Sequence, residues 1–196
     1  TTEIYTLSLH DALPIFSTPY GSLIRGIDMP QRIRYVIFYG IPRFKLNTEN
    51  IDKLSDKFIM TLSYILKDKD LDELLKRKDV EGIRNRIREI LKTKNEIKGE
   101  SFIYRDGYII FPDVNTYIQG SGRSSRLYAG GITKGASFLL DTKDMVEIFI
   151  NRAYVYGIEF KSIDEVNIEN LKKEIDEDRK KIGEKVEEKD IINPAL

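Results

Sequence analysis

The sequence predicts an α/β domain that is built on a parallel β-sheet and interrupted by an insertion of helices and a hairpin. Two short apolar runs, Tyr35–Tyr39 (YVIFY) and Ser137–Leu140 (SFLL), indicate strands of one sheet, and the first is expected to be buried on both faces. The long segment between them has helical periodicity instead. We therefore expect a sheet whose strands lie far apart in the sequence.

The insertion is predicted over residues 45–111. Apolar residues recur at the spacing of one helix face over Glu49–Leu66 and again over Leu71–Leu91, where Gly82 is expected to weaken or bend the helix. An Asp-Gly pair then separates two β-rich runs within Phe102–Phe111, which is a β-hairpin signal. Such a long segment between two strands is tolerated only at the periphery, so we expect a protruding subdomain.

The flanking residues 16–44 and 112–162 are assigned to the sheet domain. Within the second stretch, Met145–Val155 is expected to be a helix and Gly157–Phe160 a short strand. Residues 163–196 are strongly charged with one apolar stripe, which favours a surface or linker helix over the alternative of a coiled coil.

Composition excludes several classes of protein. The chain has 32 Lys and Arg against 32 Asp and Glu, so its bulk charge does not indicate a nucleic-acid binder. Without cysteine it forms neither disulfides nor a cysteine zinc site. No apolar run reaches the roughly 18 residues of a membrane span, so a soluble, cytoplasmic protein is expected. More Ile than Leu and 33% charged residues indicate a thermophile or an AT-rich genome.

The segment Tyr117–Gly131 (YIQGSGRSSRLYAGG) is the first candidate site. Arg123 and Arg126 are three positions apart, so on a helix they would project from one face. Two guanidinium groups directed at a γ-phosphate can stabilise the charge that spreads over it during transfer. Gly120 and Gly122 permit close backbone approach. The alternative is an exposed basic helix followed by a glycine-rich turn.

The segment Gly21–Pro30 (GSLIRGIDMP) is the second candidate. Gly26 indicates a close approach, and Asp28 can accept a hydrogen bond from a hydroxyl group or hold Arg25. The alternative is an ordinary loop with a local Arg–Asp pair.

A basic stretch in the insertion is a candidate DNA contact. Residues Lys76–Lys98 hold nine Lys or Arg against four Asp or Glu, and phosphate contacts are assigned to Lys76, Arg84 and Arg88. A solvated helix face explains the same pattern equally well.

Together the two candidate segments resemble motifs V and VI of superfamily-two helicases, which lie in the second of two RecA-like domains. The finer resemblance is to the reverse gyrases, helicase–topoisomerase fusions of thermophiles. It is carried by RGIDMPQRIRYVIFYGIPRF (residues 25–44) and PDVNTYIQGSGRSSRLYAGGITKG (residues 112–135). DEAD-box proteins have His-Arg at the start of motif VI, where this chain has Gln119-Gly120. The resemblance covers nearly all of residues 16–196.

The resemblance implies roles for individual residues. In the family, motif VI arginines contact the γ-phosphate across the cleft between the RecA-like domains, and motif V touches the nucleic-acid backbone and the ribose. The implied assignments are catalytic for Arg123 and Arg126, nucleotide-binding for Gln119, Gly122, Gly26 and Asp28, and DNA-binding for Arg25 beside Lys76, Arg84 and Arg88.

The resemblance also implies a function. Reverse gyrases are ATP-dependent type IA topoisomerases that introduce positive supercoils into DNA, with ATP and Mg²⁺ as cofactors and zinc only in parts absent from this chain. The implied partners are DNA, the first RecA-like domain and the topoisomerase IA domain. Residues 45–111 lie where the family has its latch, and residues 163–196 resemble the linker ahead of the topoisomerase domain.

Alone, the chain is expected to be inactive. It has no GxxxxGK[ST] phosphate loop and no acidic Mg²⁺ motif, so it supplies half of an ATP site. Two alternatives stay open: the C-terminal half of another superfamily-two DNA helicase, and a non-enzymatic DNA-binding module.

Residues 1–15 (TTEIYTLSLHDALPI) resemble the translation of a short-read sequencing adapter, whose DNA encodes this segment without a mismatch. The alternative is a genuine strand followed by a loop. The native sequence is therefore expected to begin near Phe16, with its true N-terminus missing. The one histidine, His10, lies inside this segment and is excluded from any candidate site.

Deleting residues 1–15 is expected to leave the melting temperature unchanged or higher, because an adapter-derived peptide has never been selected to pack against this domain. Thermal unfolding of the 1–196 and 16–196 chains, followed by circular dichroism, measures this. A clear fall in Tm on deletion would show that the segment is part of the fold.

Overall fold

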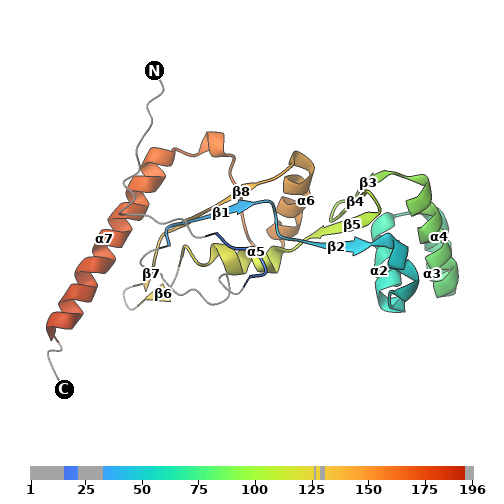
Figure 1. The fold of residues 1–196 in the computed structure, drawn as a ribbon, viewed down its shortest axis with the longest axis horizontal. Coiled ribbons are helices and arrows are strands. Elements are labelled where there is room, and N and C mark those ends of the chain that lie inside the picture. The colour runs from blue at the N-terminus through green and yellow to red at the C-terminus, as the bar shows by residue number, and fades with distance from the viewer. Residues whose placement is uncertain (1–15, 22–32, 126, 129–130, 193–196) are drawn as a thin grey trace.

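The protein is elongated, with three parts in a row (Figure 1). The computed structural model describes residues 16–21, 33–125, 127–128 and 131–192. A helical unit lies at one end, a parallel strand pair with two helices lies in the middle, and a long C-terminal helix lies at the other end (Figure 1). The α/β class predicted from the sequence is confirmed, and the fold is consistent with a fragment of a RecA-like domain.

The parallel pair joins β1 (Tyr35–Tyr39) to β8 (Ala136–Leu140), in register from Tyr35 opposite Ala136 to Tyr39 opposite Leu140. Helices α5 (Val114–Ser121) and α6 (Lys143–Tyr154) cover one face of it. The prediction that β1 is buried on both faces is wrong. Phe38 faces the core, whereas Ile37 is 64% exposed and Tyr39 is 92% exposed, because the alternate side chains point away from α5 and α6.

A separate antiparallel sheet has the strand order β2-β5-β4-β3. Its members are β2 (Arg43–Asn47), β3 (Glu96–Lys98), β4 (Ile103–Arg105) and β5 (Tyr108–Pro112). The predicted hairpin joins β4 to β5 through Asp106 and Gly107, both at positive φ (52° and 77°). Two positive φ values are what a type I′ turn requires, and Asp-Gly tolerates them.

The helical unit consists of the 3₁₀-helix η1 (Thr48–Lys53) and helices α2 (Asp56–Leu66), α3 (Lys69–Arg77) and α4 (Val80–Thr93). The second predicted helix is divided in two, but not by Gly82. Lys78 ends α3 in the left-handed conformation, and the carboxylate of Asp79 then caps α4 by accepting the N–H of Gly82 at 2.9 Å. Gly82 serves this cap, because a Cβ there would lie 2.3 Å from the Asp79 carboxylate.

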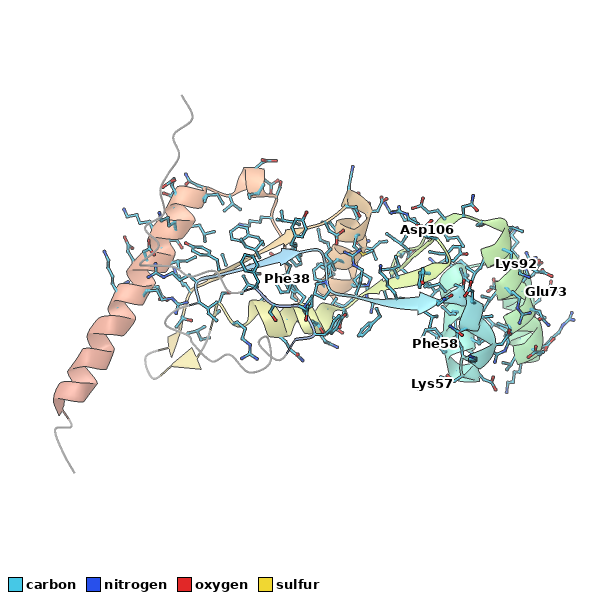
Figure 2. All side chains as sticks on the ribbon, viewed as in Figure 1. Phe38, Lys57, Phe58, Glu73, Lys92 and Asp106 are labelled. Carbon is cyan, nitrogen blue, oxygen red and sulfur yellow. The ribbon has the colours of Figure 1, made fainter. Side chains whose placement is uncertain are left out.

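Two hydrophobic cores hold these parts together, and the antiparallel sheet contributes to both. Phe102 and Ile109 pack with the helical unit, as does Phe58 at that end of the molecule (Figure 2). Ile103 and Ile110 pack in the second core with the Phe38 cluster beneath β1 (Figure 2). Side chains alternate across a strand, so the sheet separates the two cores and belongs to both.

The chain after α6 returns to the second core before the last helix. The predicted strand at residues 157–160 is wrong. Gly157 has a φ of 70°, and the N–H of Ile158 donates to the carbonyl of Ala153 at 3.3 Å, so the segment turns back instead of extending along a sheet. Ile158 and Phe160 pack against the core.

The C-terminal elements are the 3₁₀-helix η2 (Ile163–Glu165) and helix α7 (Ile168–Ile192). The predicted charged helix is therefore present. Its Ile175 and Arg179 are buried, and Arg179 donates to the carbonyls of Ile33 and Lys134, which precede β1 and β8. The remaining elements are the two-residue strands β6 (Leu127–Tyr128) and β7 (Gly131–Ile132), which pair with each other. In the part of the chain that is described, no helix combines the length and the apolar character of a membrane span.

Candidate functional site

Helix α5 carries the glycine–arginine segment and is held at its start by Asp113. The buried Asp113 carboxylate accepts the N–H of Thr116 at 3.1 Å and the hydroxyl of Thr116 at 2.6 Å, which caps the helix. The N–H of Asp113 donates to the carbonyl of Pro42 at 2.7 Å. The cap therefore ties α5 to the segment that leaves β1.

The middle of α5 is fixed by Tyr117. Its ring lies 4.9 Å from that of Phe38 and 5.1 Å from that of Phe149, measured between ring centroids. Its hydroxyl hydrogen-bonds with the hydroxyl of Ser137 on β8 at 2.7 Å, and burial raises the pKa of Tyr117. A helix held at both points has little freedom to slide, so its C-terminal end has a defined position.

Arg123 lies just beyond that end. The helix stops at Ser121, Gly122 is its cap, and the N–H of Arg123 donates to the carbonyl of Gly120 at 3.0 Å. The prediction that Arg123 projects from a helix face is therefore wrong, because the chain leaves the helix at Gly122. Arg123 and Gly122 are half-buried, and Gln119 is exposed. The three candidates lie within five consecutive positions at the end of α5.

The turn after Arg123 packs tightly against the residues that precede β8. A Cβ at Gly135 would lie 2.0 Å from the carbonyl oxygen of Ser124, so only glycine fits there. The hydroxyl of Ser125 donates to the carbonyl of Thr133 at 2.7 Å. The arginine turn is thus attached to the β8 side of the domain as well as to α5.

Four of the predicted site residues lie outside the described part of the chain. These are Arg25, Gly26, Asp28 and Arg126. Their assignments stay predictions from the sequence.

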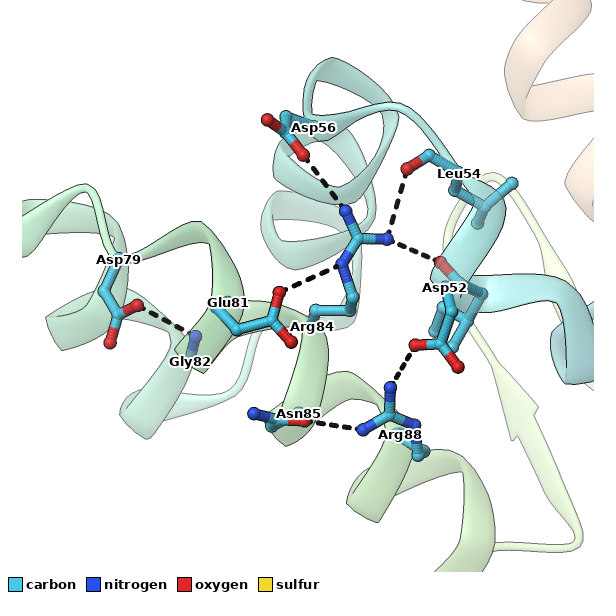
Figure 3. A network of polar contacts seen from close by, with 10 residues as sticks. Asp52, Leu54, Asp56, Asp79, Glu81, Gly82, Arg84, Asn85 and Arg88 are labelled. Carbon is cyan, nitrogen blue, oxygen red and sulfur yellow. Dashed lines mark hydrogen bonds and ion pairs between the residues drawn. The ribbon is translucent and has the colours of Figure 1, made fainter.

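Arg84, predicted to contact DNA, is an internal residue. Its guanidinium donates to the carbonyls of Ile51 (2.6 Å) and Leu54 (3.1 Å) and pairs with Asp56 (3.0 Å) (Figure 3). Its side chain is 9% exposed. A guanidinium that joins η1 to α4 is not free to meet a phosphate, so we do not carry Arg84 forward as a DNA contact.

The other two predicted DNA contacts differ from each other. Arg88 pairs with Asp52 and donates to Asn85, so its charge is already partly compensated (Figure 3). Lys76 is exposed on α3. Of the three, Lys76 is the residue whose surroundings suit an electrostatic contact with a phosphate backbone.

Arg86, which the sequence did not single out, also has a structural role. It pairs with Asp68, the N-cap of α3, at 3.1 Å and with Asp70 at 2.8 Å. Its hydrogen bond lowers the pKa of the Asp68 carboxyl. Much of the positive charge that the sequence shows in this region therefore holds helices to one another.

Two of the described candidate residues have the chemistry of phosphate ligands. Arg123 supplies a permanent positive charge and Gln119 an exposed amide, both suited to phosphate oxygens. Within the described ranges, no group of three or more His, Asp or Glu side chains is arranged to hold a metal ion.

The fold is consistent with a fragment of a RecA-like domain, and the comparisons show which proteins the chain is similar to. No family model matches the chain. The chain is 44% identical over 177 residues to a reverse gyrase of Methanocaldococcus jannaschii, a match that covers 88% of the chain. It is 32% identical to a reverse gyrase of Pyrococcus horikoshii over 99% of the chain, and 33% identical to reverse gyrase 1 of Aquifex aeolicus over 89% of it.

The chain is therefore homologous to a segment of the reverse gyrases, and the predicted relationship to that family is confirmed. It spans 10%, 16% and 19% of the lengths of these three relatives. The adapter origin of residues 1–15 stays a prediction.

We expect Arg84→Met to destabilise the protein by about 1.5–3 kcal/mol, because hydrogen bonds to a charged group are lost and buried carbonyls lose their donor. Urea denaturation gives the free energy of unfolding. Lys76→Met, at an exposed position, is the control and should change it by less than about 0.5 kcal/mol. Equal stability of the two variants would show that Arg84 does not stabilise the fold.

Proposed function

We propose that this chain is the part of a reverse gyrase that contributes motifs V and VI to its helicase-like ATPase. The observation that carries the proposal is the position of Arg123, at the end of a rigidly held helix, in a chain homologous to reverse gyrases over most of its length. The longer protein would be an ATP-dependent DNA topoisomerase that introduces positive supercoils. The described relatives are all reverse gyrases, so another helicase half or a simple DNA-binding module is not favoured.

In this proposal Arg123 and Arg126 face the γ-phosphate from the second RecA-like domain. Bound ATP with Mg²⁺ supplies the phosphoryl group, and the two guanidinium groups stabilise the charge that its oxygens gain on transfer. Gln119 and Gly122 line the phosphate end, and Gly26 with Asp28 contact the ribose. The phosphate loop would come from the first RecA-like domain, so the 196-residue chain alone should hydrolyse no ATP.

We also propose that residues 45–111 are the latch of this protein. Three observations support it: the helical unit has its own core, it lies at one end of the molecule, and its sheet is separate from the parallel pair (Figure 1). DNA would meet this unit at exposed cations such as Lys76 on α3. Arg25, assigned to DNA from the sequence alone, would be a further contact. Residues 16–44 and 112–162 would form the RecA-like part, and residues 163–196 the connection to a topoisomerase IA domain.

Arg123→Ala should reduce ATP hydrolysis sharply while nucleotide binding persists, because finger arginines act mostly on transition-state charge, where their loss costs roughly 10³–10⁵ in rate. The test protein is a chimera in which residues 16–196 replace the aligned segment of the Methanocaldococcus jannaschii reverse gyrase. Steady-state phosphate release and fluorescent-nucleotide binding are measured, and Lys57→Ala, exposed on α2, serves as control. Near-normal turnover in the Arg123 variant would remove this residue from the site.

Replacing residues 47–100 with a short Gly/Ser linker in the same chimera should spare ATP hydrolysis and impair ATP-dependent supercoiling. The physical reason is that the first core is lost as a unit, while Ile103 and Ile110 remain to complete the second core. Gel assays of plasmid topology and phosphate release give the two readouts. Loss of ATPase through unfolding of the domain would show that the segment belongs to the core, and the latch assignment would fail.

A further inference from the structure

The C-terminal helix reaches the arginine turn through one buried side chain. Nη2 of Arg179 on α7 donates to the carbonyls of Ile33 (3.0 Å), Ser124 (3.0 Å) and Lys134 (3.1 Å). Arg179 is 7% exposed. One guanidinium nitrogen thus joins three segments that are distant in the sequence.

The three carbonyls belong to segments that surround the candidate site. Ile33 precedes β1, Lys134 precedes β8, and Ser124 is bonded directly to Arg123. The peptide group that links Arg123 to Ser124 lies next to the carbonyl that Arg179 holds. Moving this carbonyl therefore moves the main chain from which the Arg123 side chain extends.

A buried guanidinium has little freedom to move. Burial lowers the pKa of Arg179, but an arginine stays protonated in proteins, so the charge remains and must be compensated. Any shift that breaks these hydrogen bonds removes acceptors from a buried charge, which is strongly unfavourable. The position of α7 and the position of the Ser124 carbonyl are consequently coupled.

Further contacts hold α7 against the segments that precede β1 and β8. The Asp178 carboxylate accepts the N–H of Lys134 at 2.7 Å, and Asp176 pairs with Arg34 at 2.6 Å. Ile175 is 1% exposed. These contacts place one face of α7 on the segments that precede β1 and β8, with Arg179 buried between them.

We propose that Arg179 is a positioning residue for Arg123, through which the placement of α7 controls ATP hydrolysis. The inference rests on the proposed role of Arg123. Helix α7 leads toward the C-terminal side of the chain, so a force or rotation applied there would reach the phosphate-facing arginine through one side chain.

The test uses the chimera described above, with ATP as the probe. Arg179→Ala should lower kcat by about ten- to hundredfold, because misplacement of a group by about 1 Å can cost two orders of magnitude, while KM for ATP changes little. Arg179→Lys, which keeps the charge with fewer aligned donors, should recover part of kcat. Glu174→Ala is the matched control on α7, since its carboxylate pairs only at the exposed surface with Lys134.

A double-mutant cycle separates positioning from general stability. If Arg179 acts through Arg123, adding Arg179→Ala to Arg123→Ala should cause no further loss of kcat. A further loss equal to that of the single variant would overturn the proposal, and so would a wild-type kcat in Arg179→Ala. If Arg179→Ala unfolds at the assay temperature, the same cycle is run with Arg179→Lys, with melting temperatures recorded for each protein.

The outcomes also distinguish the two proposals. Normal turnover in Arg123→Ala would refute the proposed function of the site and, with it, the role of Arg179. Loss of turnover in Arg123→Ala with normal turnover in both Arg179 variants would refute the positioning role alone.

Discussion

The placement of the helical unit relative to the parallel pair depends on the carboxylate of Asp141, the residue after β8. Its Oδ2 accepts the N–H of Ile41 at 2.7 Å and pairs with the guanidinium of Arg43, and its Oδ1 accepts the N–H of Thr142 at 2.7 Å. Its side chain is 8% exposed, so these donors are what makes a buried charge tolerable. Gly40, at a φ of 100°, bends the chain toward it. The joint fixes where β1 ends and β2 begins, and so the direction in which the helical unit leaves the parallel pair.

Beyond this joint, two kinds of contact hold the helical unit in place, and they differ in strength. The antiparallel sheet places Ile103 and Ile110 in the second core, where burial contributes directly to stability. Lys98 on β3 bridges to Asp144 and Glu147 on α6, at 2.7 Å each, and these carboxylates raise the pKa of Lys98 while Lys98 lowers that of Asp144. All three groups are near half-exposed, so these ion pairs contribute little to the free energy of unfolding and break easily. A unit held this way can change its surface contacts without losing its attachment to the domain.

Three arginines show how the surroundings of a side chain determine its structural role. Arg84 joins η1 to α4, and Arg179 joins α7 to three main-chain carbonyls. Arg123 follows Gly122 directly after the end of α5, and it is half-buried there. The sequence presents all three as cations in polar surroundings, and the difference arises from which backbone carbonyls the fold brings near each side chain.

The sequence by itself determined the local elements: the β1 and β8 runs, the Asp-Gly turn, the helical stripes and the charged C-terminal helix all follow from periodicity and turn chemistry over neighbouring residues. It also carried the glycine–arginine motif on which the resemblance to the reverse gyrases rests. The tertiary structure alone decided that Lys78, and not Gly82, divides the insertion helices, that one face of β1 stays exposed, and that residues 157–160 turn back on the core. It alone placed Arg84 and Arg179 inside. The physical reason is that burial of a charge depends on acceptors contributed by segments tens to more than a hundred positions away, as between Arg179 and Ile33, and no local pattern encodes that distance.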